Sequence, residues 1–458
     1  MSFLRTQPAW RIAALVIALN GAAVGAARAD TVGPSLTLAD AVARALREGR
    51  DAKIARLETE QAGAVVGQAR SIYWPQAAVS SNAGWSNRQD DTINAVNGQG
   101  VVKRYPLSSL GSNEPWVSIY IDQVLFDLSR WHGVERSELE REAAEVQETE
   151  QRESITFTVT EQYVNLLRLE RLAATDAEHV RQAEWLDRQA QTLLDAGRAL
   201  GAEREQVSLA VEEARVQAAQ HQQELEDART AFWAAIGGGA DQPAVFDLAP
   251  DSLPNAAVTS PAASDEAVRT APELRILDLR KRMEEATLAA ARAEHLPTLS
   301  MRGGYFHYGT RRFDSFESEL AIGVDLHVPM FSGFKTTNAI EGASLALEAA
   351  RLRYDAERER KRVRLKDLAR RLATAQQQPA LAERRARLAD ERRRLADLTL
   401  QAQRGSLSEA LAARAEADRA SRAAIDAYFD RILLWANLER EAGVLATTLV
   451  GEQAAVTP

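Results

Sequence analysis

The sequence of 458 residues contains no cysteine, which excludes disulfide frameworks, thiolate metal sites, cysteine nucleophiles and a lipid-modified N-terminal cysteine. Proline and glycine are scarce, with 14 and 25 residues. Few turns therefore interrupt long stretches rich in Ala, Glu, Arg, Leu and Gln, a composition typical of long helices. Lys and Arg number 56 against 65 Asp and Glu, a net charge of -9. The absence of a basic excess argues against a nucleic-acid partner.

A long apolar run occurs only near the start of the chain. Residues 12–27 are apolar almost throughout, two arginines precede them, and Ala27-Arg28-Ala29 supplies the small residues of a cleavage site. This pattern predicts a secretory signal peptide over residues 1–29, cleaved before Asp30, with a single membrane anchor as the alternative. No later apolar stretch reaches the length of a membrane-spanning helix.

The remaining sequence is internally duplicated. Residues 45–76 and 267–298 both predict an amphipathic helix of about thirty residues that ends at a proline. Strand-like stretches and a turn glycine then follow in the same order in both halves. We expect a first repeat over 30–239, a proline-rich connector over 240–263, a second repeat over 264–446 and a C-terminal tail over 447–458.

Each repeat contains two stretches with the period-2 alternation of a β-strand. Residues 320–328 alternate most clearly, 117–122 and 299–305 follow the same pattern, and 79–85 is weaker. We expect each strand to reach about ten residues, the length of a strand that crosses a membrane, although a half-buried soluble sheet would alternate in the same way. The segments that join these strands, 88–115 and 309–319, are polar and are expected to be irregular surface loops.

Aromatic residues favour the membrane interpretation. The chain has 11 Phe, 8 Trp and 8 Tyr, and more than half of them fall within 72–131 and 296–334, mostly at the ends of the predicted strands. A bilayer interface selects aromatics at these positions, whereas a soluble sheet would carry more of them in mid-strand.

The rest of both repeats predicts helices of unusual length. Between Ser129 and Leu194 there is no proline and a single glycine, which at 1.5 Å per residue gives a helix of about 100 Å. Apolar residues recur at spacings of three and four, as in coiled coils. These helices are too charged for lipid, so we expect them in an aqueous compartment, as two hairpins that turn near Gly197 and Gly405.

The ordered set of motifs resembles the TolC-like outer-membrane efflux factor family. The resemblance is carried by LTLADAVARAL at 36–46, ARS at 69–71 before Trp74-Pro75, QVLFD at 123–127, VPMFSG at 328–333, and the two turn glycines. It covers nearly the whole mature chain. It implies an α+β membrane protein of the outer membrane that extends into the periplasm: a homotrimer with four strands per subunit, forming a 12-stranded β-barrel continued by a long α-helical coiled-coil tunnel. The residues agree, because four strands cannot close a barrel alone and lipid does not tolerate open strand edges.

The function implied by the resemblance is a passive exit duct in outer-membrane lipid, for multidrug or metal efflux or for type I protein secretion. The implied partners are an inner-membrane transporter and a periplasmic adaptor (membrane fusion protein). The alternative is a secreted periplasmic coiled-coil adaptor or scaffold without a pore, although an adaptor has one helical hairpin rather than two equal repeats. The six histidines lack metal-ligand spacing and no phosphate-loop, dinucleotide or hydrolase motif occurs, so we predict no enzyme, no metal and no cofactor.

Candidate site residues lie in the strands and at the turns. In the barrel, Ile322, Val324 and Leu326 would face lipid, and the candidates for the lumen are Asp122, Asp325 and His327. The turns at Gly197 and Gly405 would lie at the periplasmic end, where the candidate gate residues are Arg198, Glu203, Arg404, Glu409 and Arg414. Charge on a long helix is more often a solvated face.

The sequence departs from the family near the turns. The family commonly has a Tyr three residues before each turn glycine, where this chain has Leu194 and Ala402, and an Asp about nine residues after the second, where it has Arg414. An aperture closed by a ring of aspartates at that level is therefore not implied.

Overall fold

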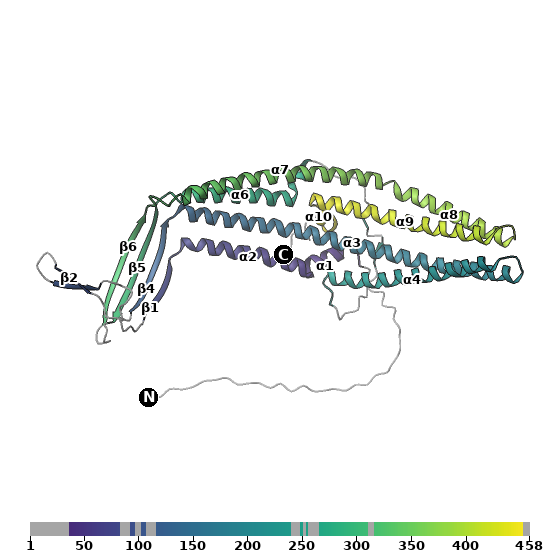
Figure 1. Cartoon of the computed structure of the whole chain (residues 1–458), viewed down its shortest axis with the longest axis horizontal. Coiled ribbons are helices and arrows are strands. Elements are labelled where there is room, and N and C mark those ends of the chain that lie inside the picture. The colour runs from purple at the N-terminus through teal and green to yellow at the C-terminus, as the bar shows by residue number, and fades with distance from the viewer. Residues whose placement is uncertain are drawn as a thin grey trace, which may run out of the picture.

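The structure is a computed structural model that describes residues 36–82, 92–96, 102–106, 116–239, 248–250, 253–254, 265–309 and 316–451. The predicted signal peptide, its cleavage site, most of the connector and the end of the tail lie outside these residues. Figure 1 shows a small sheet at one end of an elongated layer of helices.

The elements follow the same order twice. The first series comprises α1 (Leu38–Glu48), α2 (Arg50–Arg70), η1 (Ser71–Tyr73), β1 (Gln76–Asn82), β4 (Trp116–Phe126), α3 (Leu128–Asp195) and α4 (Gly201–Ala235). The second comprises α5 (Asp265–Thr270), α6 (Pro272–Ala293), β5 (Thr298–Gly309), β6 (Phe316–His327), α7 (Lys335–Ala375), α8 (Gln378–Gln401), α9 (Leu407–Ala442) and α10 (Leu445–Val450). Each series is thus a pair of helices, two long strands and a long helical hairpin.

Two expectations about local structure are wrong. The segments expected to be single helices of about thirty residues are each broken near their start. Gly49 leaves the helical region at φ -59° and ψ 144°, and Pro272, which cannot donate a backbone hydrogen bond, holds Ala271 in an extended conformation and begins α6. The segment 88–115, expected to be irregular, contains the antiparallel hairpin of β2 (Thr92–Val96) and β3 (Val102–Pro106).

The long strands form one antiparallel sheet in the order β1-β4-β5-β6. Each repeat contributes two strands, and the central β4–β5 pair joins the repeats, with Ile119 opposite Tyr305 and Asp122 opposite Arg302. The edge strands β1 and β6 have no further partner among the described residues. One chain therefore presents an open sheet with one edge from each repeat.

The helices continue from the sheet as a layer. Helix α3 runs without a break for 68 residues, which is about 100 Å and confirms the predicted length. In the half nearer the sheet the helices pack in the order α2, α3, α6, α7, and in the distal half in the order α4, α3, α9, α8 (Figure 1). The layer therefore has the same two edges as the sheet, one from each repeat.

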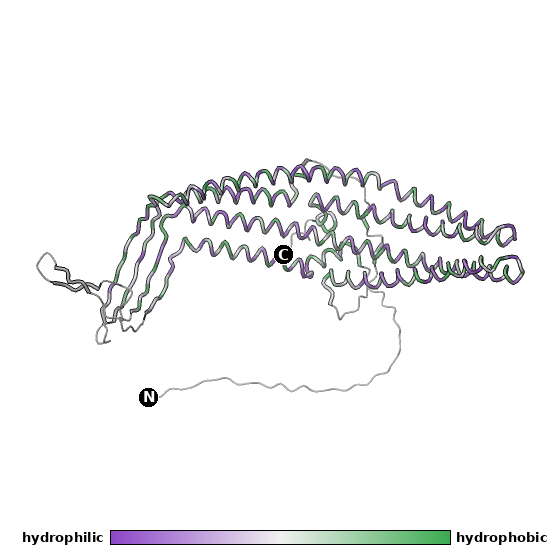
Figure 2. The backbone as a smooth tube through the Cα atoms, in the orientation of Figure 1, coloured by the Kyte–Doolittle hydropathy of each residue, from purple (hydrophilic) through white to green (hydrophobic). Residues whose placement is uncertain are grey.

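The largest core lies at mid-length, where the two repeats meet around α1. Tyr163, Phe232, Phe429 and Ile432 are fully buried there, and the Tyr163 hydroxyl donates to the Leu36 carbonyl at 3.0 Å. Along the long helices apolar and polar residues alternate rather than segregate (Figure 2). None of the described helices has both the length and the apolar character required to cross a membrane.

Candidate functional site

The sheet has two chemically different faces. One carries Leu320, Ile322, Val324 and Leu326, whose exposed fractions lie between 62% and 83%. In register with these residues are Met301 and Gly303 on β5, and Ile119 and Ile121 continue the face on β4. Apolar side chains keep most of their surface in water on β6 and about half of it on β4, so this face lacks the partner that would bury it.

The opposite face is polar, and it carries all three lumen candidates. The Arg302 Nε lies 2.5 Å from Asp122 Oδ1 across the β4–β5 pair. Asp325 lies on the neighbouring strand opposite Ser300, and His327 ends the same face opposite Thr298. The alternation expected from the sequence is thus present, and the tertiary pairing adds Arg302 to this face.

Aromatic side chains gather where the strands meet the helices. Phe126 packs edge-on against Trp131 with ring centroids 5.3 Å apart, and Phe331 packs in the same way against Phe334 at 5.6 Å. Trp74 beside them is 71% exposed. Large exposed aromatics at one level of the molecule are typical of a membrane–water boundary.

The two distal turns use their glycines differently. Gly197 ends α3 in the left-handed region, with φ +67°, where glycine has no steric penalty. In the second turn the left-handed residue is Gln403, with φ +62°. Gly405 serves another purpose, because a Cβ there would lie 2.8 Å from Thr399 Oγ1 and 3.2 Å from the Leu400 backbone nitrogen. The glycines matched by sequence are therefore not structural equivalents.

Two of the gate candidates cap helices. The Glu203 carboxylate accepts the Leu200 backbone N–H at 2.9 Å, and Glu409 accepts that of Ser406 at 3.3 Å. Each is the third residue of its helix, α4 or α9. Glu409 completes a capping box, because the Ser406 hydroxyl accepts the Glu409 backbone N–H at 3.2 Å. Leu200 has no side-chain acceptor, so Glu203 supplies only the reverse half of that arrangement. Both acids thus have a local structural role at the tip.

The candidate arginines of the turns differ in exposure and contacts. The Arg198 guanidinium donates to the Gln403 side-chain oxygen, so it joins the two turns and holds them at the same level. Arg404 is exposed and makes no side-chain hydrogen bond or ion pair within the described part of the chain. It is therefore the gate candidate that is free to meet another molecule.

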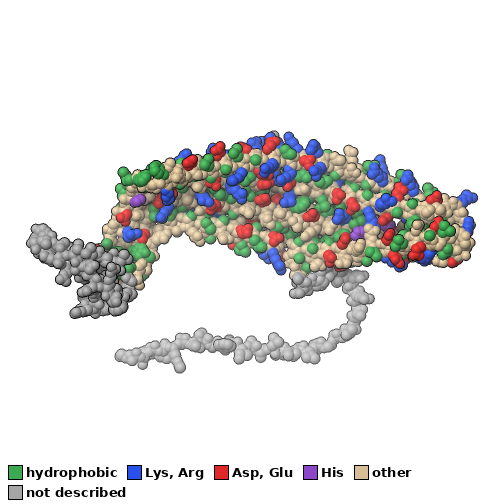
Figure 3. All heavy atoms as spheres, viewed as in Figure 1, with side chains coloured by type: hydrophobic (Ala, Val, Ile, Leu, Met, Phe, Trp, Pro, Cys, Tyr) green, Lys and Arg blue, Asp and Glu red, His purple; other side chains and the backbone are tan. Residues whose placement is uncertain are grey.

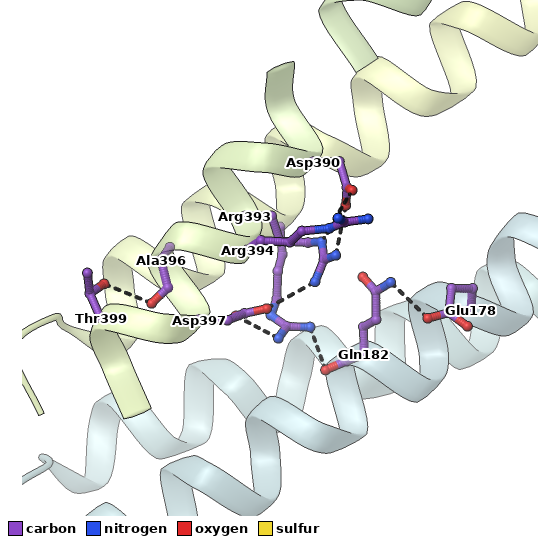
Figure 4. Close-up of polar contacts among 9 residues, drawn as sticks. Glu178, Gln182, Asp390, Arg393, Arg394, Ala396, Asp397 and Thr399 are labelled. Atoms are coloured by element: carbon purple, nitrogen blue, oxygen red, sulfur yellow. Dashed lines mark hydrogen bonds and ion pairs between the residues drawn. The ribbon is translucent and has the colours of Figure 1, made fainter. Parts of the chain in front are cut away.

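Arg414 lies inside the layer rather than at its surface, with 11% of its side chain exposed. Its guanidinium pairs with Asp397 of α8 at 2.8 Å, donates to the Gln182 carbonyl of α3 at 2.6 Å, and stacks 5.2 Å from the Trp185 ring centroid. Figure 4 shows Asp397 and Gln182 on the two helices that meet at this junction, with the Gln182 side chain turned toward Glu178. Burial lowers the pKa of Arg414, and Asp397 opposes that effect.

A charged cluster that sequence reasoning missed joins the two hairpins farther from the tip. Asp176 contacts His221 at 2.5 Å and Arg422 at 2.7 Å, and Asp418 contacts His179 at 2.5 Å and Arg422 at 2.8 Å. Asp176, His179, Asp418 and Arg422 line a cleft of about 180 Å³. Burial would raise the pKa of Asp418, but hydrogen bonds from His179 and Arg422 outweigh it and lower that pKa. No local spacing reveals the cluster, since its members come from three helices.

The described residues include no group of three or more His, Asp and Glu placed to hold a metal ion. The described residues instead combine a two-faced sheet, an aromatic boundary and a long helical layer in which the buried Asp176 and Lys361 form ion pairs.

Comparisons with known proteins agree with this architecture. No protein-family model and no curated protein matches the sequence, but solved structures match most of it. The outer membrane protein VceC of Vibrio cholerae has a TM-score of 0.71 at 15% identity, covering 89% of this chain and 96% of that chain. The CmeC outer membrane channel of Campylobacter jejuni has a TM-score of 0.71 at 16% identity, covering 94% of both chains.

The MtrE outer membrane channel of Neisseria gonorrhoeae, in its open state, has a TM-score of 0.69 at 18% identity and covers 89% of both chains. Identities this low carry information about fold, and the matches extend over sheet and helices alike. The chain therefore has the fold of one subunit of bacterial outer-membrane channels, as its resemblance to the TolC-like family implied for a single chain.

Proposed function

We propose that the protein is the outer-membrane exit duct of an export system, a passive channel through the outer membrane and across the periplasm. It acts as a homotrimer, with an inner-membrane transporter and a periplasmic adaptor as partners. Its cargo belongs to one of three classes: drugs, metal ions, or proteins exported by type I secretion. The observation that carries the proposal is the open, two-faced sheet at the end of a helical layer about 100 Å long.

The edges of the sheet support a closed assembly. Strands β1 and β6 each present backbone groups that no described residue satisfies, and lipid supplies no hydrogen-bonding partner. Pairing β6 of one copy with β1 of the next removes both edges. Three copies give a barrel of 12 strands, with the apolar face toward lipid and the face of Asp122, Arg302 and Asp325 toward the lumen.

The helices support the periplasmic part of the proposal. The face of the helical layer that is in view in Figure 3 carries Lys, Arg, Asp and Glu side chains along its length, which suits contact with water. A duct of this length would carry cargo from the adaptor and transporter to the barrel without exposing it to the periplasm.

The gate would lie at the distal turns. Arg404 and the Arg198–Gln403 link stand at the tip, whereas Glu203 and Glu409 are held by their capping contacts. Arg414, one of the gate candidates from the sequence, would act from within one subunit by tying α9 to α8 and α3.

Membrane fractionation and conductance test the proposal. The duct should resist carbonate extraction from outer membranes, run as a trimer on gels without boiling, and give stepwise conductance in planar bilayers. A periplasmic adaptor or scaffold, the alternative function, would be released from membranes as a soluble protein and would give no conductance. Either of those two results contradicts the duct.

A further inference from the structure

We infer that a specific seam joins neighbouring subunits in the distal half of the tunnel: helix α8 of one copy packs antiparallel on α4 of the next, with apolar residues at the centre and arginines facing glutamates. The inference rests on the proposed trimeric duct. It adds which two helices meet between subunits, the register in which they pack, and the charged residues that make this pairing specific.

The positions of α4 and α8 make them the helices available to a second copy. In the distal half α3 and α9 lie between them, so α4 and α8 form opposite edges of the same layer. One side of the layer therefore ends in α4, from the first repeat, and the other side ends in α8, from the second repeat. Contact between two different edges is heterologous, and rotation about an axis can close it into a ring.

Both edge helices expose apolar residues on the side away from their own subunit. On α4 these are Leu209 and Val216, 54% and 57% exposed; on α8 they are Leu388 and Leu395, 50% and 61% exposed. The members of each pair are seven residues apart, the spacing of one coiled-coil heptad. In a single subunit the apolar residues of both helices are exposed to water. In the assembly, the apolar residues of α4 would be buried against those of α8 from the next copy.

The register follows from the level turns. Helix α4 begins just after its turn and α8 ends just before its own, so the two helices run in opposite directions. The Arg198–Gln403 contact holds the two turns level within one subunit, and rotation about the tunnel axis keeps them level between subunits. Counting from the turns then places Leu209 beside Leu395 of the next copy and Val216 beside Leu388.

The charges on the two edges are complementary. Helix α4 has seven acidic and three basic residues, whereas α8 has six basic and four acidic residues. Figure 3 shows Lys and Arg side chains along the upper border of the molecule, over α7 and α8. The acidic edge of one copy thus meets a basic edge of the next, which gives specificity for this pairing.

Unpaired charges lie at matching heights. Glu213 and Glu224 on α4, and Arg384 and Arg387 on α8, are exposed and form no ion pair among the residues that the structure describes. In the register given above, Arg387 falls within about one helical turn of Glu213, and Arg384 within about one turn of Glu224. Such residues beside an apolar seam occupy the positions that choose coiled-coil partners.

Disulfide trapping tests the seam, and the cysteine-free chain supplies a clean background. The variant Val216→Cys/Leu388→Cys is oxidised in outer membranes and boiled in non-reducing detergent. We expect covalent dimers and trimers. The matched control Val216→Cys/Leu395→Cys moves one partner by a heptad, about 10 Å, which is beyond disulfide reach, and should give at least tenfold less product.

Reversing the charges on the two helices tests whether these charges make the pairing of α4 with α8 specific. Glu213→Arg/Glu224→Arg and Arg384→Glu/Arg387→Glu should each lower the trapped yield at least fivefold at low salt, and combining all four should restore it. Equal yields from the matched and shifted cysteine pairs, or no rescue, in a protein that is trimeric by native mass, would overturn the seam and leave the duct intact. A monomeric native mass would overturn both.

Discussion

Buried charged residues hold the helical layer together at mid-length. The Lys361 ammonium, with 7% of its side chain exposed, pairs with Glu441 at 2.8 Å and Glu273 at 3.1 Å. Nearby, both carboxylate oxygens of Glu153 accept the Ala446 backbone N–H, at 3.2 and 3.3 Å, at the start of α10. Removing one partner of such a contact leaves the other buried without compensation, so these residues link helices that lie far apart in the sequence.

The buried Glu153 carboxyl should make the stability of the folded protein depend on pH. Burial raises the pKa of this carboxyl to about 7, against the opposing hydrogen bond from Ala446. The folded state then holds the proton more tightly than the unfolded state, so the free energy of unfolding falls as the pH rises from about 4.5 through 7. The full effect is about 3 kcal/mol.

Glu153→Gln should remove this contribution while keeping a hydrogen-bond acceptor for α10. Thermal unfolding followed by circular dichroism at pH 5 and pH 8 is the measurement. We expect the wild type to lose more stability than the variant between the two. Parallel pH dependences for both proteins would contradict the role of Glu153.

Alanine at Arg414 and alanine at Arg404 should affect the stability of the protein to different extents. Arg414→Ala leaves the largely buried Asp397 with Arg393 alone, at 3.0 Å, and removes the contact with the Gln182 carbonyl. We expect a loss of about 1–3 kcal/mol. Arg404→Ala, the exposed control, should change the free energy of unfolding by less than about 0.5 kcal/mol. Chemical denaturation of the purified proteins checks both, and equal effects would show that Arg414 does not tie the hairpins.

At the scale of the element, each strand of the sheet serves two environments because its side chains alternate. Val324 and Gly323 are neighbours in β6 but point to opposite faces, beside Met301 and Arg302 respectively. A Cβ atom added at Gly323 would have no heavy atom within 4 Å. The two positions therefore lie at nearly the same level along β6 but on different faces of the sheet, so each serves as a control for the other.

Substitution by arginine at Val324 and at Gly323 should have different effects on stability, because the two positions lie on opposite faces of the sheet. Val324→Arg should cost about 2–4 kcal/mol at the middle of the membrane, whereas Gly323→Arg should be tolerated better because it adds a charge to a polar face that has room for it. The temperature at which the proposed trimer dissociates on detergent gels measures the difference. If the two variants dissociate alike, the assignment of the faces to lipid and lumen is wrong.

At the scale of the whole molecule, the two repeats must end at the same height. The Arg198 contact with Gln403 requires level turns, although the first hairpin contains one unbroken helix of 68 residues and the second is interrupted between α7 and α8. The lengths of the two hairpins are thus coupled through a contact at their ends.

Deleting one heptad from α3 and one from α4 should shorten the first hairpin by about 10 Å and break this match. We expect a trimer that is less stable to heat. Deleting a heptad from α8 and α9 as well should restore the level turns and recover most of the stability, in a shorter tunnel. Heat-dissociation gels on the three proteins make the comparison, and a matched double deletion no better than the single one would argue against coupled lengths.

The sequence by itself determined the elements whose cause is local. Alternation predicted the four strands of the sheet, the absence of proline predicted the length of α3, and the repeated order of motifs predicted two hairpins. It failed where a single residue overrides a favourable pattern, as at Gly49 and Pro272, each of which breaks a helix whose apolar periodicity continues across it.

Tertiary structure decided how the repeats meet. The pairing of β4 with β5, the cluster around Arg422 and the burial of Arg414 join residues from distant parts of the chain, and no local spacing encodes those contacts. A charged residue on a long helix can be exposed to water, or it can be buried in an ion pair with another helix. Which of these occurs depends on the helix that packs beside it. That choice is set by packing over the whole layer, because burial of an ion is favourable only where a partner is supplied by a neighbouring element.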